Sequence, residues 1–461
     1  MRKPFLGLPI LALLTIVGVA WLAAGAPGVA GAAEGAVSHG PDLTRILLGV
    51  SLILLTAKLG GHVFETWGMP AVLGELVGGI LLGNLTLIGL DFFEFLRHEV
   101  VLDSLAEIGI IFLLFMIGLE SELRELAKVG LSATLAAVLG VVAPFFLGFF
   151  VSKWFLPEAH VLVHVFIGAT LCATSVGITA RVLRDIGKLS TPEARIILGA
   201  AVIDDVLGLI ILAVVTGAIS AANAGGSFEP SSIGLILLKA LLFFLGAILV
   251  GLYVSPRLFK LASKLRGSGL LLATALIICF GLAYFAAIIG LAPIVGAFAA
   301  GLALEEVHYK DFLERGEHRI EEAIEPLTSF LVPIFFVLMG IKVDLSTMAR
   351  FDILGFAVAL TVVAVIGKQA CALGVLERGA NRTAVGLGMI PRGEVGLIFA
   401  GIGASLYLAG ERVIAPPVYS AVVFMVIVTT LVTPPLLSWS LARGDRARPV
   451  HEGTGSATKP G

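Results

Sequence analysis

The chain has 461 residues, of which 58% are hydrophobic and 14% charged, and its mean hydropathy is +1.04. This composition excludes a soluble globular protein and is typical of a polytopic helical membrane protein. The formal net charge of −2 gives no reason to expect a nucleic acid as partner. The three cysteines lie in apolar segments, so we expect neither a zinc site nor a disulfide framework.

The N-terminus has the pattern of a secretory signal peptide. Arg2 and Lys3 precede an apolar run over residues 5–24, and small residues at 30–32 form an A-x-A cleavage site. The pattern predicts a signal peptide over residues 1–32. An uncleaved first helix is the alternative, because the apolar run is long for a signal.

Thirteen apolar segments follow that are long enough to cross a bilayer, which takes about 20 residues of helix. The chain then ends in a polar segment, residues 442–461, for which we expect a disordered cytoplasmic tail. The predicted spans are residues 43–66, 70–88, 105–126, 130–153, 160–184, 194–219, 232–255, 268–289, 291–306, 324–346, 352–376, 382–409 and 413–441.

Basic residues gather in alternate loops, and the basic side of a membrane protein is cytoplasmic. The loops on the poor side contain only Arg45, Arg97, Lys153, Lys342, Arg350 and Arg412. The other side includes the C-terminal tail. We therefore expect a multi-pass protein of the bacterial inner membrane, with its N-terminus outside and its C-terminus in the cytoplasm.

An internal repeat links the two halves of the chain. The M-P-A-V-L-G run at 69–74 is similar to A-P-I-V-G at 292–296, and the apolar run at 111–119 is similar to 334–341. The offset is 223 between Pro70 and Pro293 and 222 between Gly118 and Gly340. Seven spans separate the partners, so the copies must be inverted, and inverted repeats are typical of transporters.

Residues 199–215 lie within span 194–219 and contain two adjacent carboxylates, Asp204 and Asp205, near the middle. One aspartate at the centre of a membrane helix costs about 2.5–3.5 kcal/mol, and two neighbouring carboxylates also repel each other. The flanking residues are apolar and offer no solvation. We expect such a pair only at a wet cavity, an ion or a buried cation, so the span predicts a site for a cation and protons.

Two further spans contain residues that interrupt a helix. Span 160–184 carries the polar run 173–179, and span 382–409 carries Pro391-Arg392-Gly393-Glu394. Proline removes a helix hydrogen bond, and broken backbone at membrane depth must line a cavity or lie inside the protein. Discontinuous helices at equivalent positions of two repeats point to a binding site. For run 173–179 taken alone, ordinary helix packing is the favoured interpretation.

Lys368 is another charge at mid-membrane depth. It lies about 8 residues from the cytoplasmic end of its span, and Asp204 lies about 10 residues from that end of its own, so their depths differ by a few ångströms. A buried lysine near a carboxylate is a candidate proton carrier. The alternative is that Lys368 extends to the cytoplasmic surface.

Four segments together resemble a known family. The chain is similar to the second family of monovalent cation:proton antiporters, and within it to the NapA-type sodium/proton antiporters, over about residues 43–441. The segments are A-T-S-V-G-I-T (173–179), G-A-A-V-I-D-D-V-L-G-L (199–209), G-L-A-P-I-V-G-A-F (290–298) and G-M-I-P-R-G-E-V-G-L (388–397).

The resemblance implies an all-α sodium/proton antiporter fold of about 13 transmembrane helices, an inverted repeat of six plus six with a linking helix, and two crossed discontinuous helices. It also implies a homodimer in the lipid bilayer. The implied parts of the transporter domain, residues 43–441, are a core domain at about 105–219 and 324–409, a dimer or scaffold domain from about 43–88, 268–306 and 413–441, and the linking helix at 232–255.

The same resemblance assigns roles to seven residues. Asp205 is implied as the main Na⁺ ligand with Asp204 beside it, and Lys368 pairs with the first aspartate when the cation is absent. The crossing helices contribute four supporting residues, Thr174, Ser175, Arg392 and Glu394.

The chain is thus expected to exchange a monovalent cation, Na⁺ and also Li⁺, for protons by alternating access, in pH homeostasis and salt tolerance. With Lys368 as a second proton carrier, exchange of two protons for one Na⁺ would be electrogenic. We expect no cofactor and no enzymatic activity, since no nucleophile or metal set converges in the sequence. The alternatives are a potassium/proton antiporter of the same family, a cation channel and an organic-anion carrier of the bile-acid type, and the Asp204–Asp205 pair argues against the last.

Overall fold

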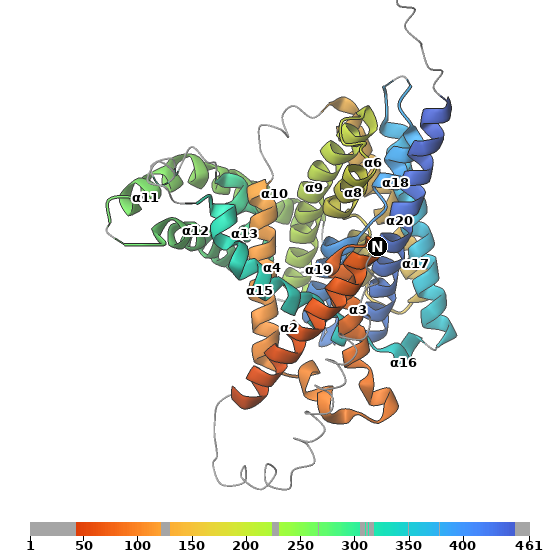
Figure 1. The fold of residues 1–461 in the computed structure, drawn as a ribbon, viewed down its shortest axis with the longest axis horizontal. Helices are drawn as coiled ribbons and strands as arrows, with labels where there is room; N and C mark the ends of the chain where they lie inside the picture. Colours follow the sequence, from red (N-terminus) through yellow and green to blue (C-terminus); the bar gives the residue numbers. More distant parts are fainter. Residues whose placement is uncertain are drawn as a thin grey trace, which may run out of the picture. The chain divides into compact units, whose positions relative to one another are not determined.

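The computed structural model describes residues 43–120, 130–223, 230–265, 267–304, 309, 312, 318–348, 350–377 and 379–447. The predicted signal peptide, residues 1–32, lies outside this part of the chain. The described residues form helices, apart from one short antiparallel hairpin (Figure 1). The chain divides into two compact units. Unit 1 comprises residues 1–121, 227–354 and 414–420, and unit 2 comprises residues 122–226, 355–413 and 421–461.

Unit 1 is built mainly from apolar helices. Two of its helical segments are 3₁₀ turns and one, η3, is a π-helical turn. In chain order its elements are α2 (Leu43–Thr66), α3 (Ala71–Gly83), η1 (Leu85–Ile88), η2 (Asp91–Arg97), α4 (Val100–Glu120), α10 (Pro230–Leu249), η3 (Val250–Val254), α11 (Ser255–Ala262), α12 (Leu270–Ile288), α13 (Pro293–Ala303), α15 (Ile320–Ile341) and α16 (Leu345–Met348).

Unit 2 contains the motif-bearing helices. Helices α17 and α20 begin in unit 1 and continue into unit 2. The elements are α6 (Leu131–Phe155), α7 (Val161–Thr170), α8 (Val176–Asp185), α9 (Pro192–Asn223), α17 (Phe351–Gln369), η5 (Ala370–Gly374), α18 (Arg382–Gly388), α19 (Gly393–Ser405), β1 (Tyr407–Leu408), β2 (Glu411–Arg412) and α20 (Pro416–Ala447).

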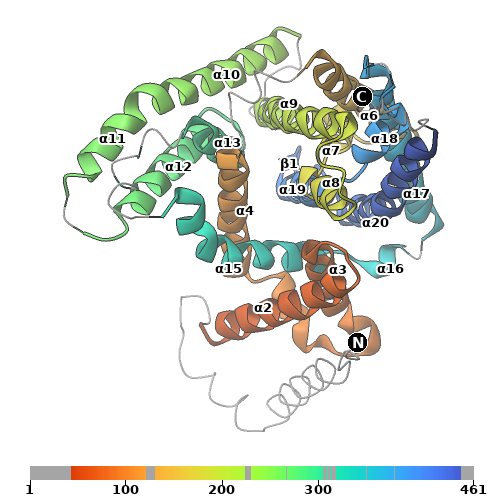
Figure 2. The same ribbon diagram turned by 45° about the horizontal axis from the view of Figure 1, so that its top comes forward.

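Within unit 2, α6 packs along α9 (Figure 2). Helix α20 ends at Ala447, so the described chain is still helical past residue 442, where the tail was predicted to begin.

The predicted all-α polytopic membrane fold is confirmed. Nine helices among the described residues are long and apolar enough to cross a membrane, and α18 with α19 forms a further, bent candidate. The predicted spans 70–88, 160–184 and 291–306 contain shorter helices: α3 begins after Pro70, α13 begins at Pro293, and α7 ends at Thr170 before the break. The count of thirteen spans therefore stays a prediction.

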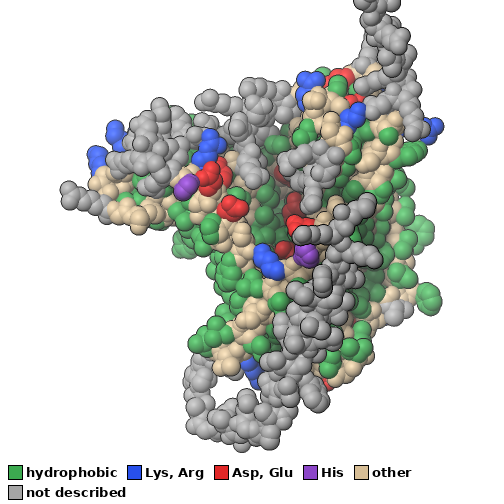
Figure 3. Space-filling view, in the orientation of Figure 1, with side chains coloured by type: hydrophobic (Ala, Val, Ile, Leu, Met, Phe, Trp, Pro, Cys, Tyr) green, Lys and Arg blue, Asp and Glu red, His purple; other side chains and the backbone are tan. Residues whose placement is uncertain are grey.

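Hydrophobic side chains cover much of the visible face of the molecule (Figure 3). Large apolar residues are exposed on several helices, for example Phe146 and Phe150 on α6 and Ile277 and Phe285 on α12. A soluble protein rarely exposes so many apolar side chains, whereas lipid is a suitable environment for them. The surface is that of a multi-pass membrane protein.

Two glycine crossings in unit 1 share one register. Gly79 of α3 packs on Gly340 of α15, and Gly301 of α13 packs on Gly118 of α4, with backbone against backbone at both crossings. A Cβ on Gly340 would overlap the carbonyl of Leu76, and a Cβ on Gly118 would overlap the carbonyl of Phe298.

The residue numbers of the two crossings are related by a constant offset of 222. Adding 222 to Gly79 and Leu76 of α3 gives Gly301 and Phe298 of α13, and subtracting 222 from Gly340 of α15 gives Gly118 of α4. Two copies related by a two-fold axis produce this arrangement. It supports the predicted repeat for these four helices, while its extension to all spans stays a prediction.

The two compact units do not coincide with the core and scaffold domains expected from the resemblance. Helices α4 and α15 were expected in the core domain but belong to unit 1, and most of α20 belongs to unit 2. The core and scaffold division stays a prediction.

Candidate functional site

Both predicted discontinuous helices are broken in the structure, and both lie in unit 2. Helix α7 ends at Thr170 and α8 begins at Val176, with non-helical backbone over residues 173–175. Helix α18 ends at Gly388 and α19 begins at Gly393, with a bend of 44° between them. Ordinary helix packing, the interpretation favoured for run 173–179 taken alone, is therefore wrong, because residues 173–175 interrupt the helix.

The two breaks are hydrogen-bonded to each other. The backbone N–H of Ser175 donates to the carbonyl of Pro391 at 2.7 Å. The hydroxyl of Thr179 donates to the carbonyl of Gly388 at 2.6 Å, and the hydroxyl of Thr174 donates to the carbonyl of Met389 at 3.3 Å. Carbonyls that lose their helix partners at a break need new donors, and polar groups of the backbone and side chains of the other broken helix supply them.

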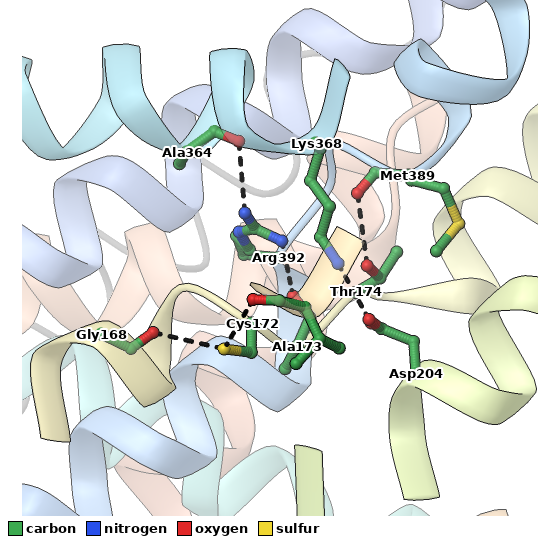
Figure 4. Close-up of polar contacts among 10 residues, drawn as sticks. Gly168, Cys172, Ala173, Thr174, Asp204, Ala364, Lys368, Met389 and Arg392 are labelled. Carbon is green, nitrogen blue, oxygen red and sulfur yellow. Dashed lines mark hydrogen bonds and ion pairs between the residues drawn. The ribbon is translucent and has the colours of Figure 1, made fainter. Parts of the chain in front are cut away.

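Arg392 joins the crossing to a third helix. Its side chain is fully buried, and its two terminal nitrogens donate to the carbonyls of Ala173 at 2.8 Å and of Ala364, on α17, at 3.2 Å (Figure 4). Its Nε atom is buried without a partner among the described residues. Asp204 interacts with it electrostatically. The guanidinium thus places a fixed positive charge beside the crossing and ties α17 to it.

Helix α9 carries the two aspartates through the unit. The Thr191 hydroxyl caps its start, accepting from the N–H of Ala194 at 3.2 Å, and Pro192 occupies the first helical position. Asp204 is fully buried, and its Oδ1 lies 3.0 Å from Lys368 Nζ, which is also fully buried (Figure 4). Lys368 therefore points into the unit, and the alternative in which it extends to the surface is wrong.

Asp205 lies beside this pair but is not part of it. Consecutive helix residues point about 100° apart, so Asp205 faces a different direction from Asp204. Its side chain is 8% exposed, and its Oδ1 is buried without a partner among the described residues. Asp204 Oδ2 is likewise buried without a partner among the described residues. Because an unpaired buried carboxylate oxygen is costly, these two oxygens are the atoms best suited to hold a cation or a proton.

Glu394 adds a third carboxylate to the surroundings of Asp205. Its Oε2 accepts a hydrogen bond from the Ser175 hydroxyl at 2.7 Å, which fixes it to the first turn of α19 beside the crossing. Asp205 interacts electrostatically with Asp204, Glu394 and Lys368. The net balance of these neighbours is negative when all carboxylates are ionised, which favours a bound cation or proton over an empty site.

The structure thus brings all seven residues named from the sequence into one region of unit 2. Thr179, Gly388 and the carbonyl of Ala364 are additional contributors that the sequence analysis did not name as site residues. Thr179 lies in the same motif as Thr174 and Ser175, and a third hydroxyl in an apolar span was the available signal. A backbone carbonyl such as that of Ala364 has no side-chain signal, so the sequence could not have shown it.

Comparison with known proteins identifies the family. Residues 50–443 match the family described as sodium/hydrogen exchanger, transmembrane. This chain belongs to the sodium/hydrogen exchanger family. The resemblance recognised from the motifs is therefore confirmed, and with it the class of cation–proton antiporters.

Curated relatives of this exchanger are similar over most of their length. The high-affinity Na⁺/H⁺ antiporter NhaS3 of Synechocystis is 39% identical over 86% of this chain and 89% of its own. The Na⁺/H⁺–K⁺ antiporter GerN of Bacillus cereus is 37% identical over 86% of this chain and 97% of its own. A Na⁺/H⁺ antiporter of Enterococcus hirae is 33% identical over 84% and 96%.

A solved structure agrees on the fold of the exchanger. The sodium proton antiporter MjNhaP1 of Methanocaldococcus jannaschii matches with a TM-score of 0.61 at 18% sequence identity, over 88% of this chain and 99% of that one. At this identity the likeness concerns the fold alone. It shows that the described helices follow a known antiporter architecture.

Proposed function

We propose that this exchanger carries Na⁺ in one direction and protons in the other by alternating access, with Asp205 as the principal ligand. The observation that carries the proposal is the buried Oδ1 of Asp205, which has no partner among the described residues, next to the paired Asp204. A carboxylate in this condition needs a positive partner, and either Na⁺ or a proton satisfies the need. The names of the three relatives support Na⁺ as the cation.

Competition for the same oxygen couples the two fluxes. A site with Asp205 protonated and a site with Na⁺ bound are both close to neutral, whereas the empty ionised site carries an extra buried charge. Moving that extra charge through a low-dielectric region is costly. The loaded and protonated forms can therefore change their exposure to the two sides, and the empty ionised form cannot. This difference makes the protein an exchanger and prevents a leak.

Lys368 would supply a second proton per cycle. In the structure its ammonium pairs with Asp204. We propose that a cation bound at Asp204 displaces the ammonium from this carboxylate and that Lys368 releases a proton in the same step. Exchange of two protons for one Na⁺ moves net charge, so we propose that the exchanger is electrogenic.

The cellular setting follows from the family and from the basic loops. We propose that the exchanger lies in the bacterial inner membrane with its C-terminus in the cytoplasm, functions as a homodimer and serves pH homeostasis and salt tolerance. The asymmetry of basic residues between alternate loops supports the orientation.

A flux assay in proteoliposomes tests the proposal. An acid-interior gradient is read with a pH dye while Na⁺, Li⁺, K⁺ or choline is added outside. We expect Na⁺ and Li⁺ to dissipate the gradient with the native chain and not with Asp205→Asn. Asp352→Asn, which changes an exposed carboxylate, is the matched control and should behave as the native chain.

Two outcomes would contradict the proposal. Dissipation by K⁺ alone would make the protein a potassium/proton exchanger, a possibility that the name of the Bacillus cereus relative raises. Absence of any cation response in folded, reconstituted protein would exclude cation–proton exchange.

A further inference from the structure

Helix α6 packs against α17 and η5 along a single face. The Ser132 hydroxyl accepts from the N–H of Leu376 at 2.9 Å, and the backbone of Ala136 contacts Gly374. Four residues further along α6, Gly140 meets Cys371 and Lys368, and Pro144 meets Gly367. The contact residues of α6 are thus spaced four apart, which places Ser132, Ala136, Gly140 and Pro144 on one face.

Gly140 lies beside the Lys368 ammonium. A Cβ built on Gly140 would overlap Cys371 Sγ and would lie 3.5 Å from Lys368 Nζ and 3.7 Å from Lys368 Cδ. The lysine side chain therefore packs directly against the backbone of α6 at Gly140. Any larger residue at position 140 would occupy the space next to the ammonium.

Pro144 changes the hydrogen bonding of the same turn. In an α-helix the carbonyl of residue 140 accepts from the N–H of residue 144, but proline has no N–H. The carbonyl of Gly140 therefore lacks its regular donor inside a helix, and both residues are buried. A buried carbonyl without a donor is unfavourable unless another group supplies a hydrogen bond.

The Lys368 ammonium has more N–H groups than its one observed partner uses. An ammonium has three N–H groups, and Asp204 is the single hydrogen-bond or ion-pair partner of Lys368 among the described residues. When a cation occupies Asp204, the nitrogen must leave this oxygen, and a buried nitrogen without an acceptor is costly.

We propose that the backbone carbonyl of Gly140 is the second acceptor of Lys368, to which Nζ moves when a cation takes its place on Asp204. The inference rests on the proposed cation–proton exchange. It assigns to the Gly140–Pro144 pair a positioning role: the glycine provides the space and the proline keeps the carbonyl free.

The test restores the missing N–H. Pro144→Ala places a backbone donor opposite the carbonyl of Gly140 and so occupies the second acceptor. Purified full-length protein in detergent is titrated with NaCl, and the rise in unfolding temperature gives the apparent Na⁺ affinity. We expect Pro144→Ala to weaken apparent Na⁺ binding about tenfold, because the lysine then competes more strongly for Asp204; tenfold corresponds to about 1.4 kcal/mol.

The effect must disappear when the lysine is absent. In a Lys368→Met background no side-chain N–H at position 368 can donate to the Gly140 carbonyl. Adding Pro144→Ala should then leave the Na⁺ affinity unchanged, as a double-mutant cycle requires. The matched control is Pro435→Ala, which restores an N–H to an exposed proline of α20 and should leave the affinity of the native chain unchanged.

A second variant tests the inference if the Pro144→Ala protein does not fold. Gly140→Ala combined with Cys371→Ala removes the overlap with the thiol while placing a methyl group beside the lysine. It should weaken Na⁺ binding relative to Cys371→Ala alone, again only when Lys368 is present.

Unchanged Na⁺ affinity in Pro144→Ala, or an equal loss in the Lys368→Met background, would overturn the inference while leaving the exchange function intact. Absence of Na⁺-dependent stabilisation and flux in the native chain would instead contradict the proposed function itself.

Discussion

Lys368 Nζ lies 3.0 Å from Asp204 Oδ1, and neither side chain is exposed. Removing one partner of a buried pair leaves an uncompensated charge and costs about 3–5 kcal/mol, whereas replacing both partners with neutral groups is often nearly neutral. We therefore expect Asp204→Asn to lower the free energy of unfolding by about 3 kcal/mol or more, and Asp204→Asn combined with Lys368→Gln to recover most of that loss.

Reversible denaturant unfolding in detergent at neutral pH measures this cycle. The matched control is Asp103→Asn, because Asp103 pairs with Lys342 at a partly exposed position, where an ion pair is worth about 1 kcal/mol or less. A double variant as unstable as Asp204→Asn would show that the two charges do not compensate each other in the folded protein.

Lys368 also decides the charge moved per cycle. In Lys368→Gln the second proton carrier is absent, so exchange should continue as one proton for one Na⁺ and become insensitive to membrane potential. Proteoliposomes with the potential set by a K⁺ gradient and valinomycin measure this: the native rate should respond to the potential and the variant rate should not. A potential-dependent Lys368→Gln protein would exclude Lys368 as the second carrier.

Substitution of Arg392 should lower the free energy of unfolding through a lost hydrogen bond, with the positive charge kept. Its guanidinium reaches the carbonyls of Ala173 and Ala364 at the same time, which the single nitrogen of a lysine cannot do with the same geometry. Arg392→Lys keeps the charge but gives up one hydrogen bond to a charged group, so we expect a loss of about 1.5–3 kcal/mol in unfolding free energy. Arg412→Lys, at an exposed position, should change stability little. Equal stability of both variants would show that the bridge to α17 does not stabilise the fold.

The sequence predicted much of this site because burying charge in a membrane is so costly. Asp204, Asp205, Lys368 and Arg392 lie in apolar spans, where few structural roles account for them. Pro391 marked one helix break in the same way. These signals are local in the sequence, so they were readable without a structure.

Other features were not readable because they depend on backbone contacts between distant residues. The carbonyl of Ala364 and the space beside Gly140 have no side-chain signal, and only the approach of helices distant in the sequence brings them to Arg392 and Lys368. The count of spans also exceeded the long helices found, since apolar composition does not reveal that α7 or α13 is short.

The repeat predicts paired effects at the glycine crossings of unit 1. A Cβ at Gly79, Gly118, Gly301 or Gly340 would overlap a backbone carbonyl, which cannot move aside as a side chain can. Overpacking of this kind costs about 1–3 kcal/mol and exceeds the gain in helix propensity from glycine to alanine, about 1 kcal/mol at most.

Because the two crossings share one register, alanine at Gly79 and at Gly301 should lower the unfolding temperature by similar amounts, and so should alanine at Gly118 and at Gly340. Gly281→Ala on α12 is the matched control, since its Cβ would meet nothing within 4 Å and the helix propensity of alanine should make it neutral or stabilising. If one crossing tolerated alanine and the other did not, the shared register would not reflect equivalent packing, and the argument for a two-fold repeat in these four helices would fail.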